Sequence, residues 1–198
     1  AQQIPYLKLV LFFASATSLG LTYKGIMTFL PAYMGENVRL SFIRLNTVSL
    51  GGTVATVALL SGALGQYVAG RLVDRYAPEK LYLVAALTGT FFVFAMAFSS
   101  NLPLIFYAVC YAFLYFSTQP IQNYLISRYL PIHRQGLGYG LHFSLTFGVG
   151  STSAAFSGYL ADHFGLQSVF YAMGFCFVLA SLLLLLLVRQ SGNPVRAK

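Results

Sequence analysis

Polar and apolar residues alternate along this chain in long blocks rather than in short periods. Six stretches are long and apolar enough to cross a bilayer, which takes about 20 mostly apolar residues in a helix. The pattern predicts spans at residues 6–33, 47–73, 80–99, 103–127, 137–161 and 166–188, followed by a polar tail over 191–198. The predicted domain organisation is one six-helix bundle over 1–190 and a short tail.

The breaks between the spans carry residues that end or begin helices. Pro31 and Gly35 follow the apolar part of the first span, and Pro78, Pro103 and Pro131 stand near the starts of later ones. Proline suits the first turn of a helix, because its missing N–H has no intrahelical partner there. These breaks leave six helices, which put both termini on one side of the membrane.

Composition agrees with lipid as the main solvent. Hydrophobic residues make up 58% of the chain and charged residues only 8%, against roughly 25% charged residues in soluble domains. The net charge of +8 comes from basic residues scattered between the spans, without the stripe or cluster that nucleic-acid binding needs. We therefore expect a lipid bilayer, and no nucleic acid, as partner.

The basic residues favour one side of the membrane. Two of them, Arg39 and Arg44, lie between the first two spans. Because cytoplasmic loops are enriched in lysine and arginine, the bias predicts that both termini are cytoplasmic. The terminal side carries Lys8, Arg71, Arg75, Lys80, Arg128, Arg134, Arg189, Arg196 and Lys198.

Two features of the sequence lie outside this pattern. Cys110 and Cys176 lie inside apolar spans without partners at metal spacing, so we interpret both as small packing residues. The chain starts Ala1-Gln2-Gln3, with no cationic leader before a short apolar core, so we expect no signal peptide. The sequence could equally be a fragment.

A short phrase occurs twice, each time at the end of an apolar span. Gly70–Tyr76 reads Gly-Arg-Leu-Val-Asp-Arg-Tyr, and Gly158–Phe164 reads Gly-Tyr-Leu-Ala-Asp-His-Phe. Three spans separate the copies, so the second enters the membrane in the opposite sense. Inverted duplications of this kind recur in secondary transporters.

The fifth span is dense in small residues, which let helix backbones approach closely. Such packing is needed where helices move, although ordinary static packing explains it equally well. The residues are Gly148, Gly150, Ser151, Ser153, Ala154, Ala155, Ser157 and Gly158.

The first copy of the phrase resembles the cytoplasmic signature of the major facilitator superfamily, Gly-x-Leu-x-Asp-Arg-x-Gly-Arg-Arg. The resemblance covers the whole chain. The stretch from Gly158 to Phe170 is similar to the family's link between the fifth and sixth helices of a half, and Arg134–Gly136 resembles the entry to that fifth helix. Within the signature, Gly70, Leu72, Asp74 and Arg75 match, whereas Ala77 and the pair Glu79–Lys80 depart from the pattern.

This resemblance implies an all-α membrane protein of six helices in two inverted three-helix repeats. It would be the carboxy-terminal half, helices seven to twelve, of a twelve-helix transporter, with an amino-terminal half as partner. The stretch Gly25–Tyr33 is similar to the seventh helix of drug-exporting members, including the fosmidomycin-resistance type.

The resemblance also gives the first copy a role. Asp74 would engage a helix amino-terminus in the opposite half and latch the outward-facing state, with Gly70 permitting close contact and Arg75 holding the carboxylate. A charged loop that only sets topology is the alternative.

Lys24 is the one full charge deep within a span. A lysine there costs roughly 2.5–3.5 kcal/mol on insertion scales, so it should face a cavity or a partner. With its neighbour Tyr23 it could bind substrate or take part in coupling. It could also pair with the other half, or extend toward the outer membrane surface.

The fourth span places polar-tipped side chains at helical spacing: Tyr107, Tyr111, Tyr115, Gln119 and Gln122. Such a face could line a water-filled cavity for amphipathic or aromatic ligands. Packing between helices, with the hydroxyls hydrogen-bonded, is the alternative.

His142, just inside the fifth span, could carry a proton or be structural. Gln66, in the second span, is ambiguous in the same way.

An enzyme is not expected. Leu59–Gly62 lacks the first glycine of an intramembrane serine protease motif, and neither a metal-spaced cluster nor a phosphate loop is present. We expect no cofactor and no metal.

The predicted function is secondary transport in the bacterial inner membrane, as export of a small organic solute in exchange for protons. Uptake of an anionic solute at Lys24 is the alternative. A stand-alone six-span scaffold or sensor is a second alternative, which the length of the whole gene product would test.

Overall fold

The computed structural model describes residues 4–39 and 47–192, and every regular element in these ranges is helical. Six rods result, because three consecutive elements form the fifth. Five of the rods are long and apolar enough to cross a membrane. The elements are α1 (Tyr6–Asn37), α2 (Thr47–Val73), α3 (Pro78–Ala97), α4 (Asn101–Tyr129), α5 (Ile132–Phe143), the π-helical segment η1 (Ser144–Val149), α6 (Gly150–Phe164) and α7 (Leu166–Gly192).

Prolines near helix starts lie where their chemistry allows. Pro78 is the first residue of α3 and Pro131 is the residue before α5. Pro31 behaves differently, because α1 runs through it to Asn37, past the predicted end of the first span at residue 33. A proline leaves a backbone carbonyl of its own helix without a hydrogen-bond partner. Membrane helices tolerate this where groups of a neighbouring helix can pack against that carbonyl or bind it. Gly51 of α2 lies against the Pro31 backbone and leaves room for that approach.

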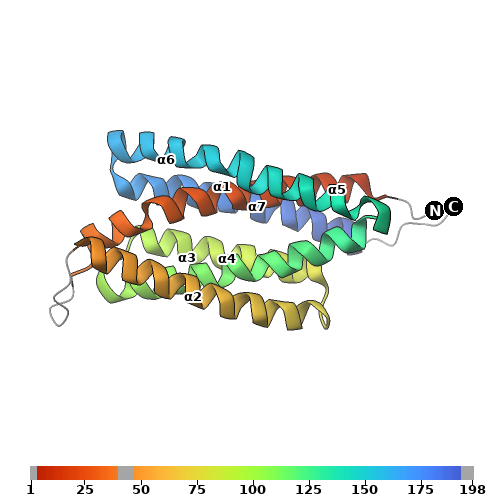
Figure 1. Ribbon diagram of the computed structural model, residues 1–198, viewed down its shortest axis with the longest axis horizontal. Coiled ribbons are helices and arrows are strands. Elements are labelled where there is room, and N and C mark those ends of the chain that lie inside the picture. The colour runs from red at the N-terminus through yellow and green to blue at the C-terminus, as the bar shows by residue number, and fades with distance from the viewer. Residues whose placement is uncertain (1–3, 40–46, 193–198) are drawn as a thin grey trace.

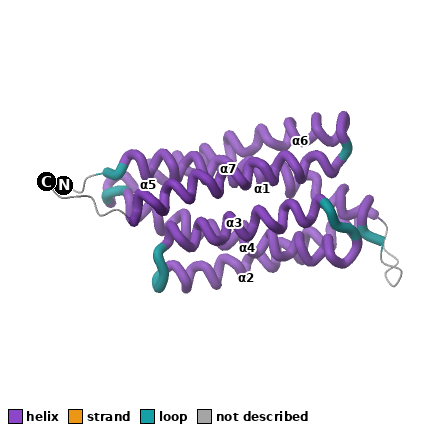
Figure 2. The backbone as a smooth tube through the Cα atoms, turned by 180° about the vertical axis from the view of Figure 1, so that it is seen from behind, coloured by secondary structure: helices purple, strands orange, loops and turns teal. Residues whose placement is uncertain are grey.

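The six rods form two inverted repeats of three: α1, α2 and α3, then α4, the α5–η1–α6 rod, and α7. The middle rod of each repeat packs against the first rod of the other, α2 against α4 and α6 against α1. In Figure 1, α2 and α6 lie on opposite sides of the bundle, and both termini lie at one end. Figure 2 shows the same arrangement from behind. We call the end that holds the termini the terminal end, and the other the far end.

Small residues let these helices approach closely. Gly89 of α3 receives the Phe177 ring of α7, and Gly174 of α7 receives the Phe94 ring of α3. In the same way Gly65 of α2 lies against the backbone of α4, where a Cβ would fall 3.0 Å from the Phe113 carbonyl carbon. The helices therefore pack closely, because aromatic rings of one helix fit against glycines of its neighbour.

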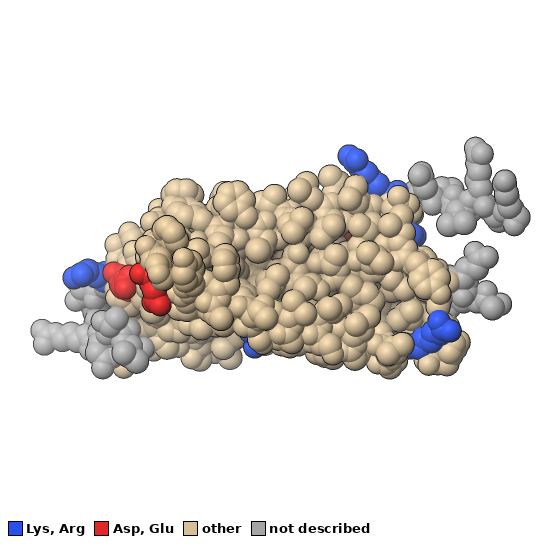
Figure 3. Space-filling model, turned by 90° about the horizontal axis from the view of Figure 1, so that it is seen from above, with Lys and Arg blue, Asp and Glu red and all other residues tan. Residues whose placement is uncertain are grey.

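The surface is that of a protein surrounded by lipid. Large apolar side chains such as Leu64, Phe91, Phe106 and Leu182 are more than half exposed on the outside of the rods. In the face shown in Figure 3, most charged side chains lie near the two ends, and the broad middle is almost entirely uncharged. Arg44 and the tail residues Arg196 and Lys198, which entered the predicted charge bias, lie outside the described residues.

Candidate functional site

A small polar cavity lies between α4 and the α5–η1 junction. It has a volume of about 40 Å³ and combines hydroxyl, amide and imidazole groups with two phenylalanine rings. Four of the residues that the sequence singled out line it: Tyr115, Gln119, Gln122 and His142. Its lining is Tyr115, Gln119, Gln122, Asn123, His142, Phe143, Thr146 and Phe147.

Aromatic rings form one wall beside this cavity. The Tyr23 ring of α1 stacks on the Tyr115 ring of α4, with centroids 4.5 Å apart and planes 8° from parallel. Phe116 meets both rings edge-on, at 5.6 Å from Tyr23 and 5.5 Å from Tyr115. The stack joins the first rods of the two repeats, the pair that the inverted topology relates.

Lys24 follows Tyr23 on α1 and faces the π-helical segment. Its Nζ lies 5.5 Å from the centroid of the Phe147 ring, a cation–π distance. Phe147 also lines the cavity, so the lysine stands next to it. All four carboxylates of the sequence, Glu36, Asp74, Glu79 and Asp162, belong to helix ends or the turn after α2. An aromatic face is therefore the contact that the structure gives Lys24 within the bundle.

The predicted polar stripe on α4 does not face a single cavity. Tyr107 meets the Phe92 ring of α3 at 6.0 Å, and Tyr111 meets the Phe177 ring of α7 at 6.1 Å. Residues four apart on a helix rotate by roughly 40° per step, because 3.6 residues make a turn. The stripe therefore winds around α4 and contacts successive neighbours. Tyr107 and Tyr111 therefore pack against neighbouring helices. Tyr115 and the two glutamines line the cavity.

The two glutamines of this stripe are hydrogen-bonded across the bundle. Gln66 of α2 donates to the Gln119 side chain at 2.8 Å, and Gln122 donates to the Tyr82 hydroxyl of α3. Tyr111 differs, since its buried hydroxyl has no partner among the described residues. Gln66, which the sequence left ambiguous, is thus a bridge between α2 and α4.

His142 closes the cavity at the end of α5. It is 5% exposed, and its ring stacks on Phe12 of α1 at 5.9 Å. Thr146 of η1 donates a hydrogen bond to the His142 carbonyl at 2.7 Å. The Nδ1 atom is buried without a partner in the part of the chain that the structure describes.

The residues proposed for a latch lie on the outside of the terminal end. Asp74 and Arg75 are exposed in the turn after α2, and a Cβ on Gly70 would meet nothing within 4 Å. Arg71 instead lies over the Tyr67 ring at 4.7 Å. Among the described residues, this surface is open for contact with another body.

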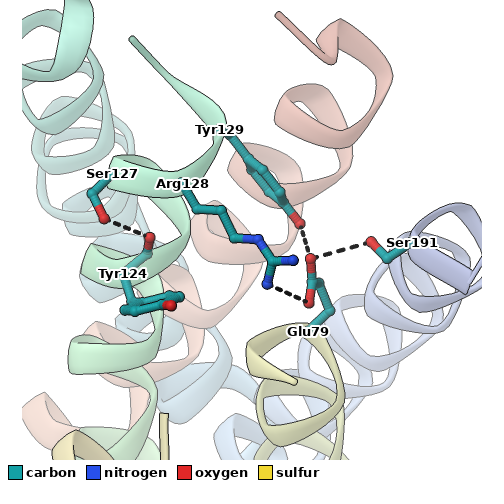
Figure 4. A network of polar contacts seen from close by, with 6 residues as sticks. All are labelled: Glu79, Tyr124, Ser127, Arg128, Tyr129 and Ser191. Atoms are coloured by element: carbon teal, nitrogen blue, oxygen red, sulfur yellow. Dashed lines mark hydrogen bonds and ion pairs between the residues drawn. The ribbon is translucent and has the colours of Figure 1, made fainter. Parts of the chain in front are cut away.

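The motif analysis missed a buried carboxylate just beyond this turn. Glu79, one of the residues that depart from the family signature, is 4% exposed in the first turn of α3. Tyr129 donates to it at 2.9 Å and Ser191 at 3.3 Å, and Arg128 lies 3.9 Å away. Figure 4 shows these groups converging from α4 and α7 on the start of α3. Only the loss of an expected basic residue signalled this position in the sequence.

The glycines predicted for close packing differ in how much space surrounds them. Gly150 lies against the Gly20 backbone of α1, where a Cβ would be 3.1 Å from the carbonyl carbon. Gly158 has ordinary room, with the Phe29 ring 3.6 Å away, and Gly148 has nothing within 4 Å among the described residues. Gly20, which the sequence analysis did not single out, is the more confined partner of this crossing.

Comparison with known proteins gives one family. The family description "Major Facilitator Superfamily" matches residues 10–198. The chain is 27% identical over 184 residues to the "Multidrug resistance protein MdtG" of Klebsiella pneumoniae (strain 342), covering 90% of this chain and 43% of the relative. The protein of the same name from Enterobacter lignolyticus (strain SCF1) is 28% identical, covering 90% and 42%. The chain thus spans less than half the length of the curated relatives it matches.

Solved structures share the fold. The in meso crystal structure of the POT family transporter PepTSo matches with a TM-score of 0.81 at 16% identity, over 96% of this chain and 39% of that one. The E. coli fucose:proton symporter FucP matches with a TM-score of 0.77 at 16% identity, over 91% and 42%. The six-rod arrangement is therefore one found in transporters.

Proposed function

Because this chain belongs to the Major Facilitator Superfamily, we propose that it is the carboxy-terminal six-helix half of a secondary transporter. It would pack against an amino-terminal half and move a small organic solute by alternating access. The chain spans 43% of the length of its MdtG relative. This supports a partner of similar size, the other half of the transporter. The proposed setting is the bacterial inner membrane with both termini in the cytoplasm, and the proposed role excludes enzymatic catalysis.

The observation that carries this proposal is the wall of stacked rings and polar tips between α1, α4 and η1. The Tyr23–Tyr115 stack offers flat apolar surface, and Gln119 and Asn123 offer hydrogen-bonding groups beside it. Flat surface with a few polar groups suits aromatic or amphipathic solutes. The cavity of about 40 Å³ within this half is far below the roughly 300 Å³ of a solute site. The other half would have to complete the site.

Export in exchange for protons is the direction we propose first. Its support is the printed name of the relatives, which describes multidrug resistance. Uptake of an anionic solute is the second candidate. Lys24 favours it, because this cation faces Phe147 and the four carboxylates of the chain lie at helix ends or in the turn after α2. In either case Asp74, Arg75 and Gly70 would meet the other half at the terminal end, where the structure leaves them open.

Flux of two aromatic dyes tests the proposal. The full-length protein is placed in proteoliposomes with an imposed pH gradient, and ethidium, a cation, and fluorescein, an anion, are followed by fluorescence. We expect gradient-driven movement of at least one dye. Lys24→Ala should lower fluorescein flux at least tenfold if the anion binds at the lysine, whereas Lys80→Ala, which removes an exposed cation of α3, should change flux less than twofold.

The outcomes separate the candidates. Movement of ethidium that survives Lys24→Ala supports export of cations and removes Lys24 from the solute path. Movement of fluorescein that needs Lys24 supports an anionic solute. Absence of flux of both dyes, with protein that is folded in the same vesicles, would contradict aromatic dyes as solutes. A complete gene product of only six spans would contradict the two-half arrangement.

A further inference from the structure

His142 is a buried histidine, and one of its two ring nitrogens has no hydrogen-bond partner among the described residues. The residue is 5% exposed and its ring stacks on Phe12 with planes 26° apart, and the nitrogen without a partner in the described residues is Nδ1. A buried polar atom without a partner costs about 1–3 kcal/mol. The same ring also lines the polar cavity described above, so a ligand in that cavity can reach the imidazole.

The adjoining cavity fixes the size of that ligand. At about 40 Å³ it holds one to about three waters, since each needs roughly 10–15 Å³ of such volume. It is too small for an organic solute. Its amide and hydroxyl lining, from Gln119, Gln122, Asn123 and Thr146, provides the polar partners that an ordered water requires.

Among the described residues, no carboxylate and no other histidine lies away from the ends of the helices. The four carboxylates lie at helix ends or in the turn after α2, and His133 and His163 lie near the ends of their rods. Imidazole is the side chain whose ordinary proton equilibrium falls near neutral pH. His142 is therefore the residue of the membrane interior best suited to gain and lose a proton.

The groups around His142 allow it to be neutral or charged. From α1 it meets Phe12, and the Lys24 ammonium lies 5.5 Å from the ring centroid of Phe147, which lines the same cavity. From α4 the cavity receives Tyr115 and two glutamines, and through Gln122 it reaches the Tyr82 hydroxyl of α3. No acidic side chain faces it in the described residues. A proton on His142 would thus be held by water and amide dipoles rather than by an ion pair, which favours release.

We propose that His142 is a proton-binding site of the transport cycle. The neutral imidazole keeps a lone pair on one of its two nitrogens, and this lone pair accepts a proton from a hydronium ion in the cavity that the ring lines. An N–H bond forms, an O–H bond of the hydronium breaks, and a water molecule is left. Release on the other side of the membrane reverses the step. This inference rests on the proposed function, because a bound proton matters only if the protein couples it to a solute.

The test compares two modes of transport in the full-length protein. Uphill flux of ethidium or fluorescein driven by a pH gradient needs both solute and proton sites. Exchange of the same dye across the membrane at equal pH needs the solute site and alternating access alone. We expect His142→Gln, which keeps hydrogen-bonding ability but cannot carry the charge, to lower uphill flux at least tenfold more than it lowers exchange. His163→Gln, at the exposed far end, should leave both within twofold.

The outcomes are distinguishable. Uphill flux retained within twofold in His142→Gln would overturn the proton site and leave the transporter intact. Loss of both modes would show that His142 serves solute binding or folding, and would also overturn it. Absence of both modes in the wild type would contradict these dyes as solutes, which is a failure of the proposed function's solute class and not of the proton site. A solute-independent check is the imidazole NMR signal of the full-length protein in nanodiscs. His142 should change protonation reversibly with pH, and a signal unchanged from pH 5 to 9 would overturn the site.

Discussion

Glu79 shows how a single side chain can hold several helices of this bundle. Its carboxylate is buried at the start of α3 and accepts hydrogen bonds from Tyr129 of α4 and Ser191 of α7. Arg128 adds an ion pair at 3.9 Å, but its side chain is 54% exposed, so solvent weakens that attraction. The hydrogen bonds to the buried carboxylate therefore carry most of the effect.

Removal of this acceptor should destabilise the protein. In Glu79→Leu the buried Tyr129 hydroxyl loses its partner, at a cost of about 1–3 kcal/mol. With roughly 2–4 °C of Tm per kcal/mol for a chain of this size, thermal unfolding in detergent should begin several degrees lower. Glu36→Leu, at an exposed position of the far end, is the matched control and should leave Tm nearly unchanged. An equal decrease of Tm in the two variants would show that the loss of a negative charge, and not of the hydrogen-bond acceptor, lowers the stability.

Among the elements, the π-helical segment is the one that departs most from a regular membrane helix. The fifth rod changes from α5 to η1 directly after His142 and returns to α-helix at Gly150. Such segments are often found at functional sites. Here the segment is held by α1, because Gly20 lies so close to Thr146 that only a glycine fits.

This crossing predicts an asymmetry between glycines. A Cβ on Gly20 would overlap the Thr146 carbonyl oxygen and lie 2.9 Å from its Cα, so backbone would have to move. We expect Gly20→Ala to cost about 1–3 kcal/mol, as overpacking does, read from thermal unfolding. Gly148→Ala, within η1 itself, meets open space and should be neutral or gain up to about 1 kcal/mol from helix propensity. If Gly148→Ala lowered the stability as much as Gly20→Ala, the close contact at Gly20 would not be the reason for the loss.

On the scale of the whole molecule, the two ends of the bundle differ in charge. The described basic residues lie mostly at the terminal end, and Glu36 and Asp162 lie at the far end. The terminal end also holds the exposed turn with Asp74 and Arg75, which would contact a second half. Orientation in the membrane is thus the property on which the proposed latch and the proposed proton path both depend.

Thiol labelling tests this orientation. In a background of Cys110→Ala and Cys176→Ala, the exposed positions Tyr76 and Asp162 are changed singly to cysteine. With both termini in the cytoplasm, a membrane-impermeant maleimide should label Asp162→Cys on intact cells. Tyr76→Cys should react only after permeabilisation. The reverse pattern would place the termini outside, and labelling of both on intact cells would contradict a single orientation.

The sequence by itself determined the all-helical membrane fold and its inverted repeats. Hydrophobic length is a property of each segment alone, and the repeated phrase with Asp74 and Asp162 can be recognised without knowing any contact. The sequence also marked Tyr115, Gln119 and His142, because polar groups within apolar spans are conspicuous.

Only the tertiary structure decided which of these groups meet. It separated Tyr107 and Tyr111 from the cavity and turned Gln66 toward Gln119. It also brought Glu79 together with Tyr129 and Ser191 from distant parts of the chain. The physical reason is that such contacts depend on how each helix is rotated about its axis and how far it slides along its neighbour. These quantities are set by packing at sites such as Gly20, where the shape of one helix fixes the place of the next.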